Sequence, residues 1–165
     1  MESDRYTIEE GGVLVVKDGV TYISDGEFKG FDKIRKVILP PSVEILGEKA
    51  FQGCTSLRSI NIPSGVGAIW GDTFCGCSSL TKIELAEGLR LIANFAFSGC
   101  KSLREVHLPA TMEQLDNYAF NNCKSLRKVI IPSATYILEN AFYGCDSLET
   151  VVIRDIKPET GKEQG

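Results

Sequence analysis

Apolar residues recur along the chain in a fixed order and at a fixed spacing. The octet AFQGCTSL at residues 50–57 returns in four near-copies, TFCGCSSL, AFSGCKSL, AFNNCKSL and AFYGCDSL. The phenylalanines at positions 28, 51, 74, 97, 120 and 142 are separated by 23, 23, 23, 23 and 22 residues. A period of roughly 20–30 residues indicates a solenoid, in which each coil must stack on its neighbours to bury its apolar face.

Each period contains a segment in which apolar and polar positions alternate. In one coil this segment is Leu57-x-x-Ile60-x-Ile62, and its period of two predicts a short strand with Ile60 and Ile62 pointing inward. Proline follows the segment in four coils, at Pro40, Pro63, Pro109 and Pro132, whereas Ala86 takes this place in another coil. Because proline cannot donate to a strand ladder, it predicts where each strand leaves the sheet.

The remainder of each coil has two further apolar elements. The spacing Val66-x-x-Ile69 predicts a segment that crosses to the opposite side of the coil. The stretch GEKAFQGC at residues 47–54 has the spacing of a single helical or 3₁₀ turn ending at Gly53, a residue that readily adopts a positive φ. Each coil is therefore predicted to contain one strand and one turn.

The pattern L-x-x-I-x-(I/L)-P-x-x-V-x-x-I-x-x-x-A-F-x-G-C-x-S runs in register from residue 28 to residue 153 and resembles the BspA-like leucine-rich repeats. The resemblance implies an α/β leucine-rich-repeat solenoid that is right-handed, with a parallel β-sheet on its concave face and short helical or 3₁₀ turns. It also implies a cell-surface or secreted protein that acts in adhesion or protein contact. The family pattern names no catalytic residues.

Three segments are expected along the chain. Residues 1–27 form an N-terminal capping segment, either a degenerate coil or a hairpin turning at Asp18-Gly19, and both arrangements cover the first edge of the sheet. Residues 28–153 are the tandem repeats, with no separate second domain, and residues 154–165 are a polar tail. The tail offers no capping coil, which predicts self-association through the C-terminal end or a place in a longer repeat array.

Composition narrows the function classes. A chain of 165 residues that is 43% hydrophobic and 24% charged is typical of one compact domain. Its 22 acidic residues outnumber its 18 basic ones, which argues against a nucleic-acid partner. The longest uncharged apolar run, GGVLVV at residues 11–16, is far shorter than the roughly 20 residues of a membrane span. The first residues, MESDRYTIEEGG, lack the features of an export signal, which keeps a cytoplasmic location open.

Cysteine occupies one position in five coils and should form a column along the inside of the turns. The residues are Cys54, Cys77, Cys100, Cys123 and Cys145, and Phe31 takes this position in the first coil. Five equivalent thiols cannot all pair, and a buried cysteine behaves as a small apolar residue, so we expect a reduced and buried column. Cys75 lies outside this column and is predicted to be the most reactive thiol.

The sequence predicts neither an enzyme nor a cofactor or metal site. Cys75-Gly76-Cys77 and the only histidine, His107, do not have the ligand spacing of structural zinc sites. A nucleophilic pair of Cys75 with His107 is also disfavoured, because the turn and the strand lie on opposite sides of a coil. No phosphate-binding loop or nucleophile elbow occurs.

Equivalent positions stack in a solenoid, so its surface columns follow from the alignment. Basic residues gather on or beside the predicted strands, at Arg35, Lys36, Arg58, Lys82, Arg104, His107, Arg127 and Lys128. This basic column on the concave face predicts binding of an acidic protein surface or an acidic, sulfated glycan. Alternatively, the charges only solvate the face, and Glu84 and Glu105 between them offset some of the repulsion.

A second candidate surface is aromatic. Phe95 and Tyr118 take equivalent outward positions in adjacent coils, and Trp70 is one coil away. Exposed aromatic side chains are common binding anchors, but they also cover gaps between coils. The sequence therefore favours a protein-interaction or adhesion module, with a structural spacer segment of a longer surface protein as the alternative.

Overall fold

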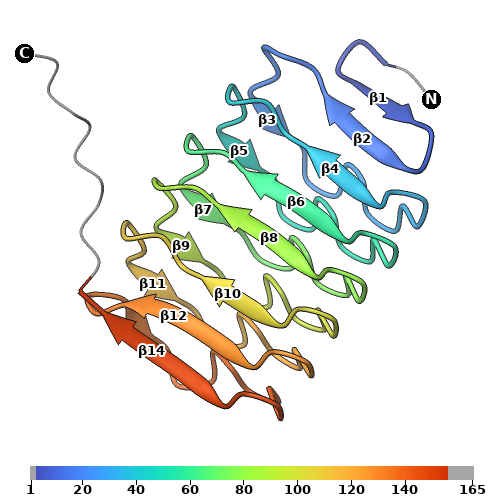
Figure 1. Cartoon of the computed structure of the whole chain (residues 1–165). Coiled ribbons are helices and arrows are strands. Elements are labelled where there is room, and N and C mark those ends of the chain that lie inside the picture. Colours follow the sequence, from blue (N-terminus) through green and yellow to red (C-terminus); the bar gives the residue numbers. More distant parts are fainter. Residues whose placement is uncertain (1–2, 156–165) are drawn as a thin grey trace, which may run out of the picture.

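Stacked coils of strands and turns build the molecule, and each coil packs on the next along one axis (Figure 1). The structure is a computed structural model that describes residues 3–155. A front layer consists of the longer strands β2 (Val13–Val16), β4 (Lys36–Ile38), β6 (Ser59–Ile62), β8 (Lys82–Leu85), β10 (Glu105–His107), β12 (Lys128–Pro132) and β14 (Thr150–Arg154). Behind it lie the short strands of the crossing segments, β3 (Tyr22–Ile23), β5 (Ile45–Leu46), β7 (Ala68–Ile69), β9 (Leu91–Ile92), β11 (Gln114–Leu115) and β13 (Tyr136–Ile137).

The sequence repeat sets the register between neighbouring coils. Lys36 pairs with Ser59, and Ser59 pairs with Lys82, in parallel ladders whose partners are one repeat apart. Ile60 and Ile62 are 3% and 1% exposed, so the alternating segments point their apolar side chains inward as predicted. The apolar core therefore fills the space between the two layers of strands.

The two ends of the solenoid differ. β1 (Tyr6–Glu9) pairs antiparallel with β2 and covers the first edge of the front layer. Tyr6 of this strand packs edge-on against Phe28, with ring centroids 5.0 Å apart. At the other end, Val151 and Ile153 of β14 are in register with buried residues of β12, yet they are 49% and 54% exposed. The C-terminal side of β14 thus presents core-type side chains at the surface.

The turns contain no helix in residues 3–155, so the predicted α/β class with helical or 3₁₀ turns is wrong, and the fold is a parallel β-solenoid. Along each turn, two kinds of backbone hydrogen bond alternate. One kind closes a single turn within the coil, as Gln52 N–H does to Lys49 C=O at 3.0 Å, and the other reaches the next coil, as Phe51 N–H does to Thr73 C=O at 2.9 Å. Lys49 and Gly53 have φ of 58° and 71°. Because left-handed residues recur every four positions here, they interrupt any helical run.

A column of phenylalanines runs through the core on the turn side. The rings stack from coil to coil, with centroids 5.6 Å apart for Phe51 and Phe74 and 5.1 Å apart for Phe97 and Phe120. All four of these side chains are fully buried. Ring stacking therefore connects the coils inside the protein, as the fixed phenylalanine position in the repeat requires.

The cysteine column lies beside the phenylalanines. Each thiol of the column donates a hydrogen bond to a phenylalanine carbonyl of the preceding coil, as Cys77 Sγ does to Phe51 at 3.1 Å. Cys54, Cys77, Cys100 and Cys123 are fully buried, which confirms the predicted column, but Cys145 is only partly buried. The six cysteines are free thiols in the structure.

Hydrogen bonding divides the front layer into two sheets. One sheet contains β1, β2, β4, β6 and β8, and the other contains β10, β12 and β14, so within residues 3–155 no ladder joins β8 to β10. The two coils remain connected elsewhere, because β9 pairs with β11 and Phe97 N–H donates to Ala119 C=O at 2.7 Å. The interruption is therefore confined to the front layer.

Candidate functional site

The outward side chains of the front layer form a surface that we call the strand face. Because neighbouring strands are parallel, the outward positions line up in two rows across the coils. The first row contains Val13, Lys36, Ser59, Lys82, Glu105, Lys128 and Thr150. The second row contains Val15, Ile38, Asn61, Glu84, His107, Ile130 and Val152. The charged residues of both rows are concentrated in the middle coils.

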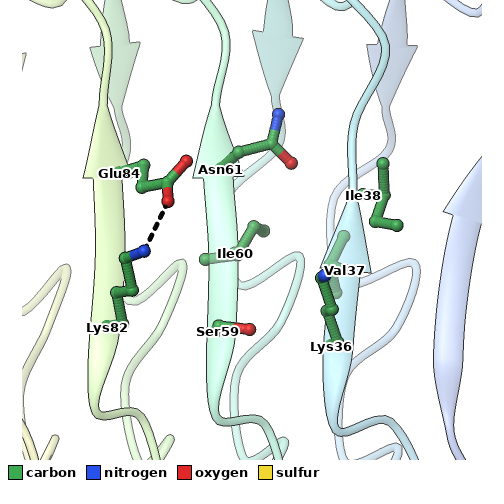
Figure 2. A pocket seen from close by; sticks show the side chains of 8 residues that line it. All are labelled: Lys36, Val37, Ile38, Ser59, Ile60, Asn61, Lys82 and Glu84. Carbon is green, nitrogen blue, oxygen red and sulfur yellow. Dashed lines mark ion pairs between the residues drawn. The ribbon is translucent and has the colours of Figure 1, made fainter.

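A shallow hollow of about 290 Å³ lies on the strand face over β4, β6 and β8 (Figure 2). Figure 2 shows Lys36, Ser59 and Lys82 side by side in the first row. Asn61 lies in the second row, and its side-chain amide accepts from the Leu39 N–H and donates to the Leu39 C=O, both at 3.0 Å. Since β4 ends at Ile38, this side chain replaces the ladder hydrogen bonds that the shorter strand does not make.

Several charges on the strand face are paired with each other. Lys82 Nζ lies 2.8 Å from Glu84 Oε1 on the same strand. Glu105 Oε1 lies 3.1 Å from Lys128 Nζ and 2.5 Å from His107 Nε2. The hydrogen bond from Lys82 lowers the pKa of Glu84, and those from His107 and Lys128 lower the pKa of Glu105. The centre of the face therefore alternates in charge.

A row of arginines precedes the front strands, and we call Arg35, Arg58, Arg104 and Arg127 the arginine row. Backbone hydrogen bonds of 2.8 Å hold adjacent members in register, from Arg58 N–H to Arg35 C=O and from Arg127 N–H to Arg104 C=O. All four residues are exposed. Thr81 takes the equivalent place in the coil between Arg58 and Arg104, so the row is interrupted once.

The eight predicted basic residues fall into two groups. Lys82, Lys128 and His107 lie in the ion pairs of the strand face. Within residues 3–155, no ion pair is formed by Arg35, Lys36, Arg58, Arg104 or Arg127. The structure thus places the unpaired positive charge mainly along the arginine row, at the edge of the strand face.

The aromatic candidates lie on the turn side. Phe95 and Tyr118 stack with ring centroids 5.1 Å apart and 4° between their planes, and Tyr143 packs edge-on against Tyr118 at 5.9 Å. Within the described part of the chain, Trp70 is 43% exposed and makes no ring contact with this stack. Sequence reasoning did not include Tyr143, although its position in the aligned coils, equivalent to that of Cys75, marked it as outward-facing.

Phe95 and Tyr118 also share an unusual backbone conformation. Their φ values are 59° and 61°, in the left-handed region that disfavours bulky side chains. Gly26, Lys49 and Asp72 have positive φ at the same place in earlier coils, so the turn geometry imposes this conformation. The strain follows from the fold and does not by itself indicate a ligand.

Another outward column, which the sequence did not lead us to predict, lies on the crossing strands. Its members are Tyr22, Ile45, Ala68, Leu91, Gln114 and Tyr136. Tyr22, Ile45 and Tyr136 are 49%, 56% and 64% exposed, and the Arg5 guanidinium lies 4.6 Å from the centre of the Tyr22 ring. The sequence did contain a sign of this column: in each crossing segment, the residue directly before the inward residue should point outward.

The described residues do not bring together the candidate groups for metal binding or nucleophilic catalysis. Residues 3–155 contain no group of three or more His, Cys, Asp or Glu side chains placed to hold a metal ion. Cys75 belongs to a turn and His107 to β10, so the structure does not bring these two together. Nor do these residues include a helix of the length and hydropathy that crossing a bilayer requires.

Comparison with known families matches most of the chain. The family described as BspA type leucine-rich repeat region matches six copies, over residues 13–127 and 68–161. No curated protein matches the chain. The sequence matches therefore cover the same coils that the structure shows.

Solved structures share this architecture. A leucine-rich repeat protein of T. pallidum (TpLRR) is 28% identical with a TM-score of 0.74, over 89% of this chain and 78% of that one. A leucine-rich repeat protein from Bacteroides ovatus is 25% identical with a TM-score of 0.60, over 96% of this chain and 53% of that one. A leucine-rich repeat protein from Eubacterium ventriosum is 19% identical with a TM-score of 0.74, over 93% of this chain and 43% of that one, and shows the shared fold.

Proposed function

Because the chain belongs to the BspA type leucine-rich repeat family, we propose that it is a non-catalytic binding module that holds a partner protein on its strand face. The family and the solved neighbours are leucine-rich repeat proteins and indicate no catalytic activity. The arginine row carries the proposal, because its four exposed guanidinium groups form no ion pair within residues 3–155.

The arginine row contributes little to folding. Adjacent coils of a parallel sheet are about 4.8 Å apart, so Arg35 beside Arg58, and Arg104 beside Arg127, are like-charge neighbours. Each such pair costs a few tenths of a kcal/mol in water. A partner that presents carboxylates to these groups offsets this repulsion, and guanidinium binds carboxylate in a bidentate geometry.

The proposed partner is therefore an acidic protein surface. The chain itself carries a net charge of −4, so attraction to such a partner depends on where the positive charges lie. The paired charges in the centre of the strand face, from Lys82 to Lys128, present both signs and fit a mixed protein surface better than a uniformly sulfated glycan. Binding of a sulfated glycan is the competing outcome.

Binding to immobilised poly-L-glutamate and to heparin tests the proposal. We expect affinity for poly-L-glutamate to fall as salt rises, and Arg104→Glu with Arg127→Glu to abolish it. Lys29→Glu with Arg90→Glu changes the net charge equally on exposed residues away from the strand face, so this pair is the matched control. Normal binding by the first variant, with loss on changing Trp70, Phe95 and Tyr118 to alanine, would place the site on the aromatic surface.

A structural spacer is the second candidate function. The exposed Val151 and Ile153 of β14 favour it, because an apolar sheet edge is the surface on which another coil or another copy packs. Self-association through this end stays a prediction, as does a cell-surface or secreted location. The polar tail expected at residues 154–165 lies almost entirely outside the described residues.

A further inference from the structure

The gap between β8 and β10 exposes part of the core in the middle of the strand face. Ile83 and Leu85 of β8 are partly exposed, whereas the equivalent Ile60 and Ile62 of β6 are 3% and 1% exposed. The equivalent residues of β10, Val106 and Leu108, are buried as well. Core side chains are therefore accessible on the β8 side of the gap, although the gap lies inside the solenoid, with β2, β4, β6 and β8 before it and β10, β12 and β14 after it.

Both strands direct their hydrogen bonds away from the gap. Ala86 N–H donates to Ile62 C=O at 3.1 Å on one side, and Leu108 N–H donates to Ile130 C=O at 3.0 Å on the other. Ala86 stands where proline ends the strand in four other coils, and it retains the N–H that makes this bond. The backbone groups that β8 and β10 would exchange in a continuous ladder face the gap instead.

The side chains around the gap are also paired on their own sides. Lys82 pairs with Glu84 within β8, and Glu105 pairs with Lys128 and His107 across β10 and β12. Within residues 3–155 no ion pair spans the gap, and Arg104 at its rim has none. The hollow above the gap has a volume of about 470 Å³, within the range of roughly 300–1,000 Å³ for ligand pockets.

From these features we propose that the gap between β8 and β10 is the anchor pocket for one apolar side chain of an extended acidic peptide segment in the partner. This inference rests on the proposed function and identifies the chemistry of the bound segment. Ile83 and Leu85 form the apolar floor that receives the side chain. Peptide groups of the segment bond to the backbone groups at the gap, since a peptide supplies donors and acceptors in equal number.

Charge favours a peptide over a sulfated glycan as the occupant. Lys82 pairs with Glu84, and His107 and Lys128 pair with Glu105, so within residues 3–155 Arg104 is the only unpaired charge of the lining and the pocket offers little positive charge to sulfate groups. The positive charge lies on either side, at Arg58 and Arg104, with Thr81 between them at the mouth. This arrangement fits an apolar residue flanked by acidic residues.

The distance between Arg58 and Arg104 also fits an extended acidic peptide with one apolar anchor residue. Arg58 and Arg104 belong to coils two steps apart, which corresponds to at least about 9.6 Å, because paired strands are about 4.8 Å apart and no ladder joins β8 to β10 within residues 3–155. An extended peptide rises about 3.3 Å per residue, so about three residues cover this distance. An anchor residue between acidic residues thus reaches the gap while its neighbours reach the arginine row.

Two peptides that differ only in the anchor residue test the inference. The probes are acetyl-Asp-Asp-Gly-Leu-Asp-Asp-amide and the same peptide with serine in place of leucine, titrated into the whole protein with detection by methyl and amide NMR. We expect the leucine peptide to bind about tenfold more tightly, as burial of one leucine side chain implies, and to shift the methyl signals of Ile83 and Leu85. The serine peptide should leave those methyl signals in place.

Variants at the mouth provide the second measurement. Thr81→Trp covers the pocket and should reduce binding of the leucine peptide to that of the serine peptide, while Thr55→Trp, at an exposed turn position, should change neither. Equal binding of the two peptides that is still lost in Arg104→Glu with Arg127→Glu would overturn the anchor pocket and leave the proposed function standing. Binding of neither peptide, with heparin bound instead, would overturn both.

Discussion

Ile60 and Ile83 are register partners in the β6–β8 ladder, yet Ile60 is 3% exposed and Ile83 is partly exposed. The difference arises because Ile60 has a paired strand on both sides, whereas β8 faces the gap. Ile60→Ala should lower the free energy of unfolding by about 2–5 kcal/mol, the usual range for a buried isoleucine, and Ile83→Ala by less than about 2 kcal/mol. Urea unfolding measures both losses, and equal losses would mean that the gap is closed in solution.

The phenylalanine column predicts a second gradient of stability. Phe97 is fully buried between Phe74 and Phe120, with ring centroids 5.2 Å and 5.1 Å away. Phe142 is partly buried and, within residues 3–155, stacks only on Phe120, at 5.5 Å. Phe97→Ala should therefore cost about 3–5 kcal/mol and Phe142→Ala less. Denaturant melts with the same loss for both variants would show that the C-terminal end is packed in solution.

Thiol labelling should separate the cysteines into two classes. Burial raises the pKa of Cys54 to about 11 and raises those of Cys77 and Cys100 further, so these should stay unlabelled until the protein unfolds. A hydrogen bond from the Cys123 thiol lowers the pKa of Cys145, whereas burial and then Asp72 raise that of Cys75.

Cys145 should consequently react before Cys75 near pH 8, although Cys75 was expected to be the most reactive thiol. The thiolate is the reactive form, so the rate at Cys145 should level off at a lower pH than the rate at Cys75. Iodoacetamide labelling followed by peptide mass spectrometry measures both rates. Rapid modification of all six cysteines in the native protein would contradict the buried column.

The pairing of Glu105 predicts how the strand face responds to pH. Hydrogen bonds from His107 and Lys128 lower the pKa of Glu105, so its stabilising contribution is present above the ordinary glutamate range and is lost as the pH falls through the lowered value. In a carboxyl-carbon NMR titration, Glu105 should titrate below an ordinary glutamate. His107→Ala with Lys128→Ala should raise its midpoint towards the ordinary value, and an unchanged midpoint would argue against the pairing.

The stacked core could be predicted from the sequence because the same core positions recur in every coil. Phe51, Cys54 and Leu57 are fully buried, as their recurrence every 23 residues implies. The conformation of the turns could not be predicted from the sequence, because Lys49 and Phe95 adopt left-handed φ at a position where only the first coil has a glycine, Gly26. The spacing of AFQGC fits a helical turn equally well, and hydrogen bonds between coils decide between the two.

The sequence predicted which residues lie on the strand face, but it did not predict which of them form ion pairs. Alignment alone placed the arginines in one column, and the structure keeps them there. Lys82 forms an ion pair with Glu84 on its own strand. This pair depends on the side-chain rotamers, which an alignment of the coils does not contain. The gap between β8 and β10 depends on the separation of two whole coils, and the only sequence sign beside it is Ala86 in place of proline.

NMR of the arginine Nε–Hε signals during titration with poly-L-glutamate tests the claim that the arginine row contacts an acidic partner. Signals of Arg35, Arg58, Arg104 and Arg127, which form no ion pair within the described part of the chain, should shift together. Arg5, paired with Glu27 at 3.3 Å, and Arg90, paired with Glu113 at 3.7 Å, should stay in place, as should the indole signal of Trp70. Shifts confined to Arg5, Arg90 or Trp70, with the arginine row unchanged, would contradict the claim.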